Sequence, residues 1–133
     1  EEILNEKIFA DINLAEDTEF IIINTGFSKQ RNQKEYWNNN PGLSPELSYY
    51  LKDRCPNLKW IGFDFISVSS YQNRQLGREA HKAFLVENEI LLIEDMDLQY
   101  LNKDKIRRIT ALPWLIDQVD GVPITIIAEY EEN

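Results

Sequence analysis

The sequence contains only one histidine, His81, only one cysteine, Cys55, and only one methionine. A lone cysteine excludes an internal disulfide and a cysteine-based zinc cluster. Cys55 is followed by Pro56 at the end of an expected helix, which does not resemble the setting of an activated nucleophile. His81 is therefore the one imidazole that this chain can offer to catalysis or to a metal.

Long apolar runs and basic clusters are also missing. No apolar stretch approaches the roughly 20 residues of a bilayer span, and the first six residues lack the basic and apolar blocks of a secretory signal. We therefore expect a cytoplasmic protein that does not bind membranes. The net charge of −9 disfavours a nucleic-acid partner. The most basic segment, residues 103–108, contains an aspartate and is interpreted as a solvated turn.

The 133 residues are 43% hydrophobic and 28% charged, which is typical of a globular protein with its own core. We expect one domain spanning residues 1–133. The five glycines are scattered, so no glycine-rich loop can cradle a phosphate. No serine stands in a glycine-flanked elbow between a strand and a helix, which argues against a Ser–His–Asp hydrolase.

Short apolar runs predict an α/β fold. Residues 20–24, 60–64 and 90–94 are strand-like and are separated by helical patterns, which indicates parallel strands joined by crossovers. Residues 106–112 and 124–128 are also strand-like, with no convincing helix between them. We expect these two to be antiparallel to part of the sheet, giving a mixed sheet flanked by helices.

Two helices and one polar segment complete the pattern. Ser44 can cap a helix that begins with proline and glutamate, and a second helix is expected over residues 77–85, with His81 in its first turn. The polar segment 28–40 has Tyr36 and Trp37 as its only large apolar side chains. It is a loop or short helix, and the two aromatic side chains either belong to a binding segment or seal the core.

The most informative grouping joins His81 to the carboxylates at the strand ends. Asp64 ends the second expected strand, Ser67 follows it, and Glu94 ends the third. Ligands of α/β folds bind at the carboxyl edge of the sheet, and an imidazole beside a carboxylate is part of the ligand set of a divalent metal. The alternative is structural: Asp64 caps the turn that follows it, Glu94 pairs with a surface lysine, and His81 faces water.

Two further carboxylates, Asp95 and Asp97, could supplement Glu94. Their spacing superficially suggests ligands for a hard cation, but the glycine and remaining oxygen positions of an EF-hand loop are absent. We do not expect a calcium site. A catalytic zinc usually takes three protein ligands, so His81 and Glu94 alone are an incomplete site.

Seven segments, in order, resemble the putative cyclase family, which includes kynurenine formamidases (arylformamidases) and isatin hydrolases. The resemblance covers roughly residues 18 to 128. The segments are IINTGF at 22–27, YW at 36–37, NPGLSPE at 40–46, IGFD at 61–64 with Ser67, AHKAFL at 80–85, IEDM at 93–96, and ALP at 111–113 with DGVP at 120–123.

The resemblance implies a swivelling β/β/α fold and hydrolysis of an amide or similar carbonyl bond with zinc or manganese. It also implies a small-molecule substrate and assembly into dimers or higher oligomers. His81 and Glu94 match two metal ligands of the family. The side chains that could contribute to a substrate pocket are Phe27, Trp37, Asp64, Ser67 and Tyr71, although the aromatic ones could equally be core.

The chain departs from the family in two ways. The main metal motif, His-x-Gly-Thr-His-x-Asp followed by a proline and another histidine, normally precedes residue 1 and is absent. The interval from His81 to Glu94 is one residue longer than usual, which predicts an insertion near residues 86–89. We expect either the carboxyl-terminal part of a longer hydrolase or a shortened, inactive relative that serves as a binding or assembly module. Completion by a different partner subunit is a third possibility. Alone, the chain should bind metal weakly or not at all and should not hydrolyse substrate.

Overall fold

The computed structural model describes residues 2–131, apart from the side chain of Asp104. The chain divides into two compact units, Glu1–Gln99 and Tyr100–Asn133. Helices, parallel strands and antiparallel strands are all present, so the expected mixed α/β class is confirmed. The two units are described in turn.

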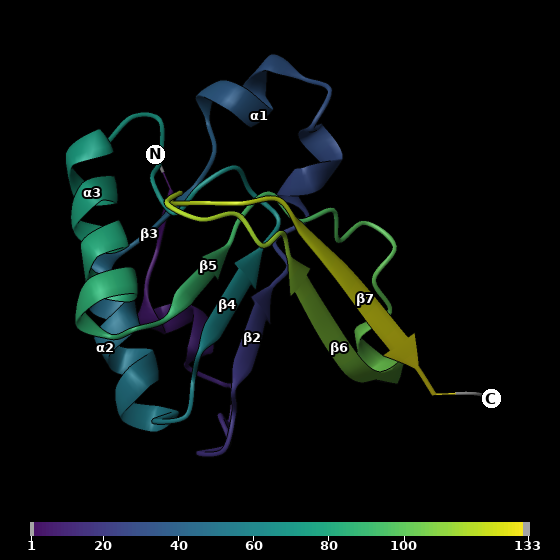
Figure 1. Cartoon of the computed structure of the whole chain (residues 1–133). Coiled ribbons are helices and arrows are strands. Elements are labelled where there is room, and N and C mark those ends of the chain that lie inside the picture. Colours follow the sequence, from purple (N-terminus) through teal and green to yellow (C-terminus); the bar gives the residue numbers. More distant parts are fainter. Residues whose placement is uncertain (1, 132–133) are drawn as a thin grey trace. The chain divides into compact units, whose positions relative to one another are not determined.

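A three-stranded parallel sheet forms the centre of the first unit (Figure 1). Its order is β2 (Phe20–Ile23), β4 (Trp60–Phe63), β5 (Leu91–Ile93), and Trp60 pairs with both Phe20 and Leu91. The three predicted strands are therefore confirmed. Because they run in the same direction, the residues that follow each strand emerge at one edge of the sheet.

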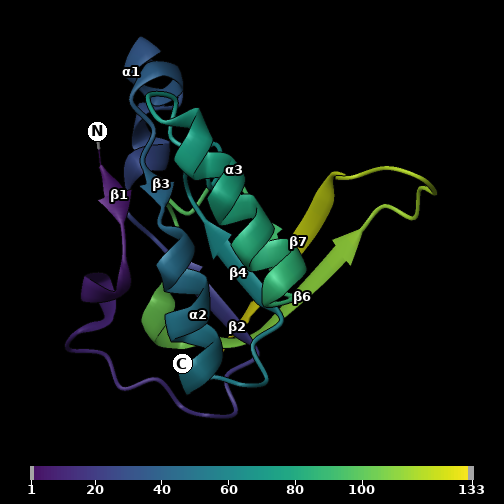
Figure 2. The ribbon, with the colours of Figure 1, turned by 90° about the vertical axis from the view of Figure 1, so that its left-hand side faces the viewer.

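Helices α2 (Pro45–Arg54) and α3 (Arg74–Lys82) lie side by side in front of this sheet (Figure 2). The Ser44 hydroxyl accepts a hydrogen bond from the Leu47 amide at 3.3 Å, so the predicted cap is confirmed. The helices bury their apolar side chains against the sheet, which gives a continuous core. Its fully buried members include Leu47, Leu51, Ile61, Phe63, Ala80 and Phe84.

Helix α3 begins earlier than the sequence suggested. The Asn73 side chain accepts from the Leu76 amide at 3.1 Å and caps a helix that starts at Arg74. His81 consequently lies in the last turn, and the expectation of a first-turn histidine is wrong. Gly77 lies inside this helix. The position has no room for a side chain, because a Cβ there would lie 2.0 Å from the Ser69 Oγ and 2.8 Å from the Ser69 Cα.

A π-helical turn, Ala83–Glu87, follows α3 directly. The Asn88 amide donates to the Ala83 carbonyl at 3.1 Å, a hydrogen bond across five residues. A π-turn accommodates one more residue than an α-helical turn. This turn overlaps residues 86–89, where the sequence predicts an insertion relative to the family, and that insertion stays a prediction.

Shorter elements surround this core. β1 (Ile3–Leu4) pairs in parallel with β3 (Gly42–Leu43), and a 3₁₀ turn, Glu6–Phe9, follows β1. The polar segment contains a 3₁₀ turn, Phe27–Gln30, and a short helix α1, Lys34–Asn38. Its two large aromatic residues differ, because Tyr36 is 1% exposed and Trp37 is 60% exposed. Tyr36 therefore belongs to the core, whereas Trp37 does not.

The second unit is a β-hairpin. After a 3₁₀ turn, Lys103–Lys105, strand β6 (Ile106–Pro113) pairs antiparallel with β7 (Ile124–Tyr130). Both strands were predicted, but among the described residues they pair with each other in a sheet of their own and do not extend the parallel sheet. No helix within residues 2–131 has the length and apolarity required to cross a membrane.

Candidate functional site

His81 and Glu94 lie next to each other at the carboxyl edge of the parallel sheet. The Nε2 atom of His81 is 3.6 Å from Oε1 of Glu94. His81 comes from the last turn of α3, and Glu94 directly follows β5. Both side chains are about one-third exposed, at 37% and 33%. The structure thus brings together the two residues that the sequence singled out, in a position open to solvent.

Backbone and hydroxyl groups set the orientation of the His81 ring. Its Nδ1 atom is 2.9 Å from the Gly77 carbonyl oxygen and 3.3 Å from Ser69 Oγ. A carbonyl oxygen can only accept, so Nδ1 carries a proton in this hydrogen bond. In the neutral ring, the lone pair is then on Nε2, the atom that faces Glu94. Metal-binding histidines are commonly oriented in this way by a backbone carbonyl.

Glu94 is held just as closely. Its Oε1 atom accepts from the Val68 amide at 2.9 Å and from the Ser67 hydroxyl at 3.1 Å. Ser67 is itself fixed, because its Oγ accepts from the Ser69 amide at 3.2 Å. The loop after β4 therefore positions the carboxylate, and Ser67 contacts Glu94.

The carboxylate changes the acidity of the imidazole. The hydrogen bond to Glu94 raises the pKa of His81, and the bond to the Gly77 carbonyl also raises it, while partial burial acts in the opposite direction. Without a metal, the pair is thus an ion pair over a wider pH range than a free histidine would allow. A metal ion would compete with the proton for Nε2.

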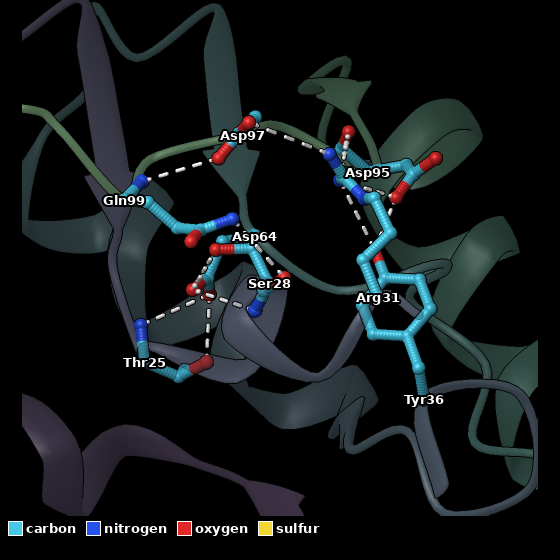
Figure 3. A network of polar contacts seen from close by, with 8 residues as sticks. All are labelled: Thr25, Ser28, Arg31, Tyr36, Asp64, Asp95, Asp97 and Gln99. Carbon is cyan, nitrogen blue, oxygen red and sulfur yellow. Dashed lines mark hydrogen bonds and ion pairs between the residues drawn. The ribbon is translucent and has the colours of Figure 1, made fainter. Parts of the chain in front are cut away.

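No third ligand accompanies the pair within the described part of the chain, where no group of three or more His, Cys, Asp or Glu residues could hold a metal ion. Asp95 and Asp97 bind elsewhere: Asp95 accepts from Arg31 at 2.7 Å and from the Tyr36 hydroxyl, and Asp97 lies 4.0 Å from Arg31 (Figure 3). They neutralise the Arg31 guanidinium rather than supplement Glu94.

Asp64 is fully buried and anchors a turn (Figure 3). Its Oδ1 accepts from the Thr25 hydroxyl at 2.6 Å and from the Thr25 amide at 2.9 Å. Its Oδ2 lies 3.4 Å from both the amide and the hydroxyl of Ser28. The observed contacts are structural, but they hold the turn that follows β2 and not the turn that follows Asp64.

The three aromatic residues predicted to contribute to a substrate pocket line two different cavities. Trp37 and Tyr71 line a common cavity of about 490 Å³, and Tyr71 is 53% exposed. Phe27 lines a different cavity of about 190 Å³ and stacks on Tyr36 with ring centroids 5.3 Å apart. Of the five possible pocket residues, Trp37 and Tyr71 line this larger cavity together.

The sequence reading missed three residues near the site. Arg74 and Arg78 line the larger cavity, and so does Ser69, which contacts the His81 ring. The arginines could have been found from their spacing, since residues 74, 78 and 81 share one face of a helix. That signal was lost because Gly77 was read as the start of the helix.

The fold and site define a mixed α/β protein with a histidine–carboxylate pair at the edge of a parallel sheet. The family model described as Putative cyclase matches residues 4–70, which is about half of the chain. The chain belongs to this family. The matched segment includes β2, α2, β4 and the Ser67 loop, while His81 and Glu94 follow it. No curated protein and no solved structure matches the chain significantly.

Proposed function

We propose that this chain contributes two ligands, His81 and Glu94, to the divalent-metal centre of a cyclase-family hydrolase. The hydrolase would cleave an amide or related carbonyl bond, as arylformamidases do, with zinc or manganese as the metal. The observation that supports this proposal is the 3.6 Å separation of His81 Nε2 and Glu94 Oε1, together with the backbone contact that fixes the other ring nitrogen.

The two donor atoms of His81 and Glu94 have a separation that suits such a metal. Two ligands of a tetrahedral zinc, each about 2.0–2.2 Å from the metal, lie roughly 3.4 Å apart, which is close to the separation observed. Both side chains are already oriented, His81 by the Gly77 carbonyl and Glu94 by the Val68 amide. Little conformational entropy would be lost when they bind a metal.

A metal held there would polarise a carbonyl group and lower the pKa of a bound water molecule. The chain itself supplies the orientation. Ser67 and Val68 fix the carboxylate, Gly77 fixes the imidazole, and the cavity lined by Trp37 and Tyr71 adjoins His81 through Ser69. Further ligands must come from outside the described residues.

A second candidate function follows from that shortage. Since no third ligand is found among the side chains that the structure describes, the chain could instead be a binding or assembly module without catalytic activity. The two candidates differ in one measurable respect: only the first requires a metal to contact His81.

Paramagnetic NMR with Mn²⁺ tests this contact. The chain has one histidine, so its ring protons give isolated signals. If His81 is a metal ligand, millimolar Mn²⁺ should broaden these signals selectively, and Glu94→Gln should weaken the broadening. Glu19→Gln, which removes an exposed carboxylate paired with Lys59, is the matched control. Equal broadening of all surface signals would reject the metal contact at His81 and favour the binding or assembly module.

Calorimetric titration and a hydrolysis assay complete the test. The 133-residue chain should bind Zn²⁺ weakly, because two ligands do not make a closed site. Stoichiometric, tight binding would overturn the incomplete-site proposal. Aryl formamides and cyclic amides should not be turned over by the chain alone. In an assembly whose partner completes the ligand set, His81→Gln should lower the rate at least 100-fold, and an unchanged rate would reject the hydrolase.

A further inference from the structure

The larger cavity combines flat aromatic walls with positive charge. It has a volume of about 490 Å³ and is lined from three directions. Trp37 comes from α1, Ser69 and Tyr71 from the loop after β4, and Arg74 and Arg78 from α3. This volume is in the range of small-molecule sites. All of these residues belong to the first compact unit.

Both aromatic side chains are more than half exposed, and each contacts a neighbouring side chain. Trp37 is 60% exposed, and its indole ring packs edge-on against the buried Tyr36 at 5.8 Å. Tyr71 is 53% exposed, and the Arg74 guanidinium lies 5.3 Å from its ring centroid. Large apolar rings that face a cavity offer stacking surfaces for a planar ligand.

The charge of the cavity is opposite to that of the whole chain, which has a net charge of −9. Arg74 and Arg78 are one helical turn apart and line the same cavity. None of the described residues that line it is acidic, and no described carboxylate forms an ion pair with either guanidinium. Arg78 instead donates to the Gln75 side chain at 2.6 Å. Two guanidinium groups without a carboxylate partner are suited to bind an anionic ligand group in a bidentate manner.

The cavity also reaches the metal-ligand pair. Ser69 lines it and lies 3.3 Å from the His81 ring. Along the axis of α3, His81 is roughly 4.5 Å from Arg78 and roughly 10 Å from Arg74, at 1.5 Å per residue. A ligand whose acidic group binds the two arginines could therefore place a reactive group near His81, provided that its acidic and reactive groups are about 5–10 Å apart.

We propose that this cavity binds an aromatic carboxylate. Its ring lies against Trp37 and Tyr71, and its carboxylate binds Arg74 and Arg78. Binding of this ligand needs no metal and does not depend on the proposed function. The identification of the ligand as the substrate does rest on the proposed function. It assigns Arg74 and Arg78 as specificity-determining residues that select acids over neutral analogues.

A matched ligand pair, 2-naphthoate and 2-naphthamide, tests the proposal by titration of the full chain. The naphthoate should bind at least tenfold more tightly than the neutral amide. The double variant R74Q/R78Q should weaken naphthoate binding at least tenfold and leave naphthamide binding within twofold, since each lost charge-assisted bond costs about that factor or more. Circular dichroism confirms that each variant is folded.

Arg54→Gln is the control, because Arg54 also lies over a tyrosine ring, Tyr50, at 4.0 Å but does not line the cavity. It should leave naphthoate binding within twofold. Equal affinities for acid and amide, or an unchanged affinity in R74Q/R78Q, would overturn the proposal. Selective Mn²⁺ broadening without naphthoate binding would reject this inference alone, and naphthoate binding without selective broadening would reject only the metal centre.

Discussion

Oδ1 of Asp64 accepts two hydrogen bonds from Thr25, one from its amide at 2.9 Å and one from its hydroxyl at 2.6 Å. The two residues lie just beyond the ends of neighbouring strands, β4 and β2. Because Asp64 is 0% exposed, its charge is stabilised by these donors rather than by water. The contact fixes the turn that follows β2.

Asp64→Asn should therefore destabilise the chain. The amide NH₂ group replaces an acceptor with a donor that faces other donors, so buried hydrogen bonds are lost and unsatisfied groups remain. We expect a loss of about 2–4 kcal/mol in the free energy of unfolding, measured by urea denaturation. Asp53→Asn, at a side chain that is 84% exposed, should change it by less than about 0.5 kcal/mol. Equal effects of the two variants would contradict the anchoring role.

A second prediction concerns Gly77. Alanine in a helix is favoured over glycine by about 1 kcal/mol, but a Cβ at this position would lie 2.0 Å from Ser69 Oγ and 2.8 Å from the Ser69 backbone. The clash should dominate, since overpacking of a rigid site costs about 1–3 kcal/mol or more. Gly77→Ala should thus lower the melting temperature and shift the His81 NMR signals.

Gly121→Ala is the matched control for this variant. Apart from its two chain neighbours, no described residue has an atom within 4 Å of a Cβ placed at Gly121, so the substitution should be tolerated. If Gly77→Ala were as stable as wild type, with unchanged His81 signals, Ser69 would not be packed against α3 as described.

A third prediction concerns the protonation of His81 in the metal-free chain. Because the hydrogen bond to Glu94 raises the pKa of His81, Glu94→Gln should lower this pKa in an NMR titration of the single imidazole. The contribution to stability has a definite sign. It is fully present below the unfolded-state pKa of about 6.5 and is lost as the pH rises through the higher folded-state pKa. Glu19→Gln should leave the His81 pKa unchanged, and an equal shift in both variants would show that long-range charge, not contact, sets it.

Much of the first unit could be predicted because its signals are local. Two strands and one helix start were predicted from short local patterns, and the structure confirms them. These patterns are the apolar runs of β2 and β4 and the helix-capping sequence Ser44-Pro45-Glu46. The meeting of His81 and Glu94 was also expected, because the helix that precedes a parallel strand begins at the edge where the strand ends, although His81 lies further along α3 than the sequence indicated. Their role as metal ligands stays a prediction.

The missed features depend on contacts between distant segments. Gly77 was read as a helix boundary, whereas its lack of a side chain permits the approach of Ser69. Asp95 adopts a positive φ of 58° and bonds to Arg31, 64 residues away. Neither contact leaves a periodic pattern in the sequence. The pairing of β6 with β7 was missed for a similar reason, because strand propensity does not determine which strand is the partner.

A final prediction concerns Tyr36. Burial and, to a smaller extent, the hydrogen bond to Asp95 raise the pKa of Tyr36 to about 12. In a spectrophotometric titration, one tyrosine should therefore ionise about two pH units later than an exposed one. Tyr36→Phe should remove this late phase.

The same shift predicts how the stability responds to alkali. The folded state favours neutral Tyr36, so its contribution is intact below the unfolded-state pKa of about 10 and declines as the pH rises through 12. Tyr36→Phe should abolish this part of the alkaline dependence and cost about 1 kcal/mol at neutral pH, because the hydroxyl donates to Asp95. If the late phase persisted in Tyr36→Phe, the group protected from ionisation would be another tyrosine, and the Arg31–Asp95 contact would not involve this hydroxyl.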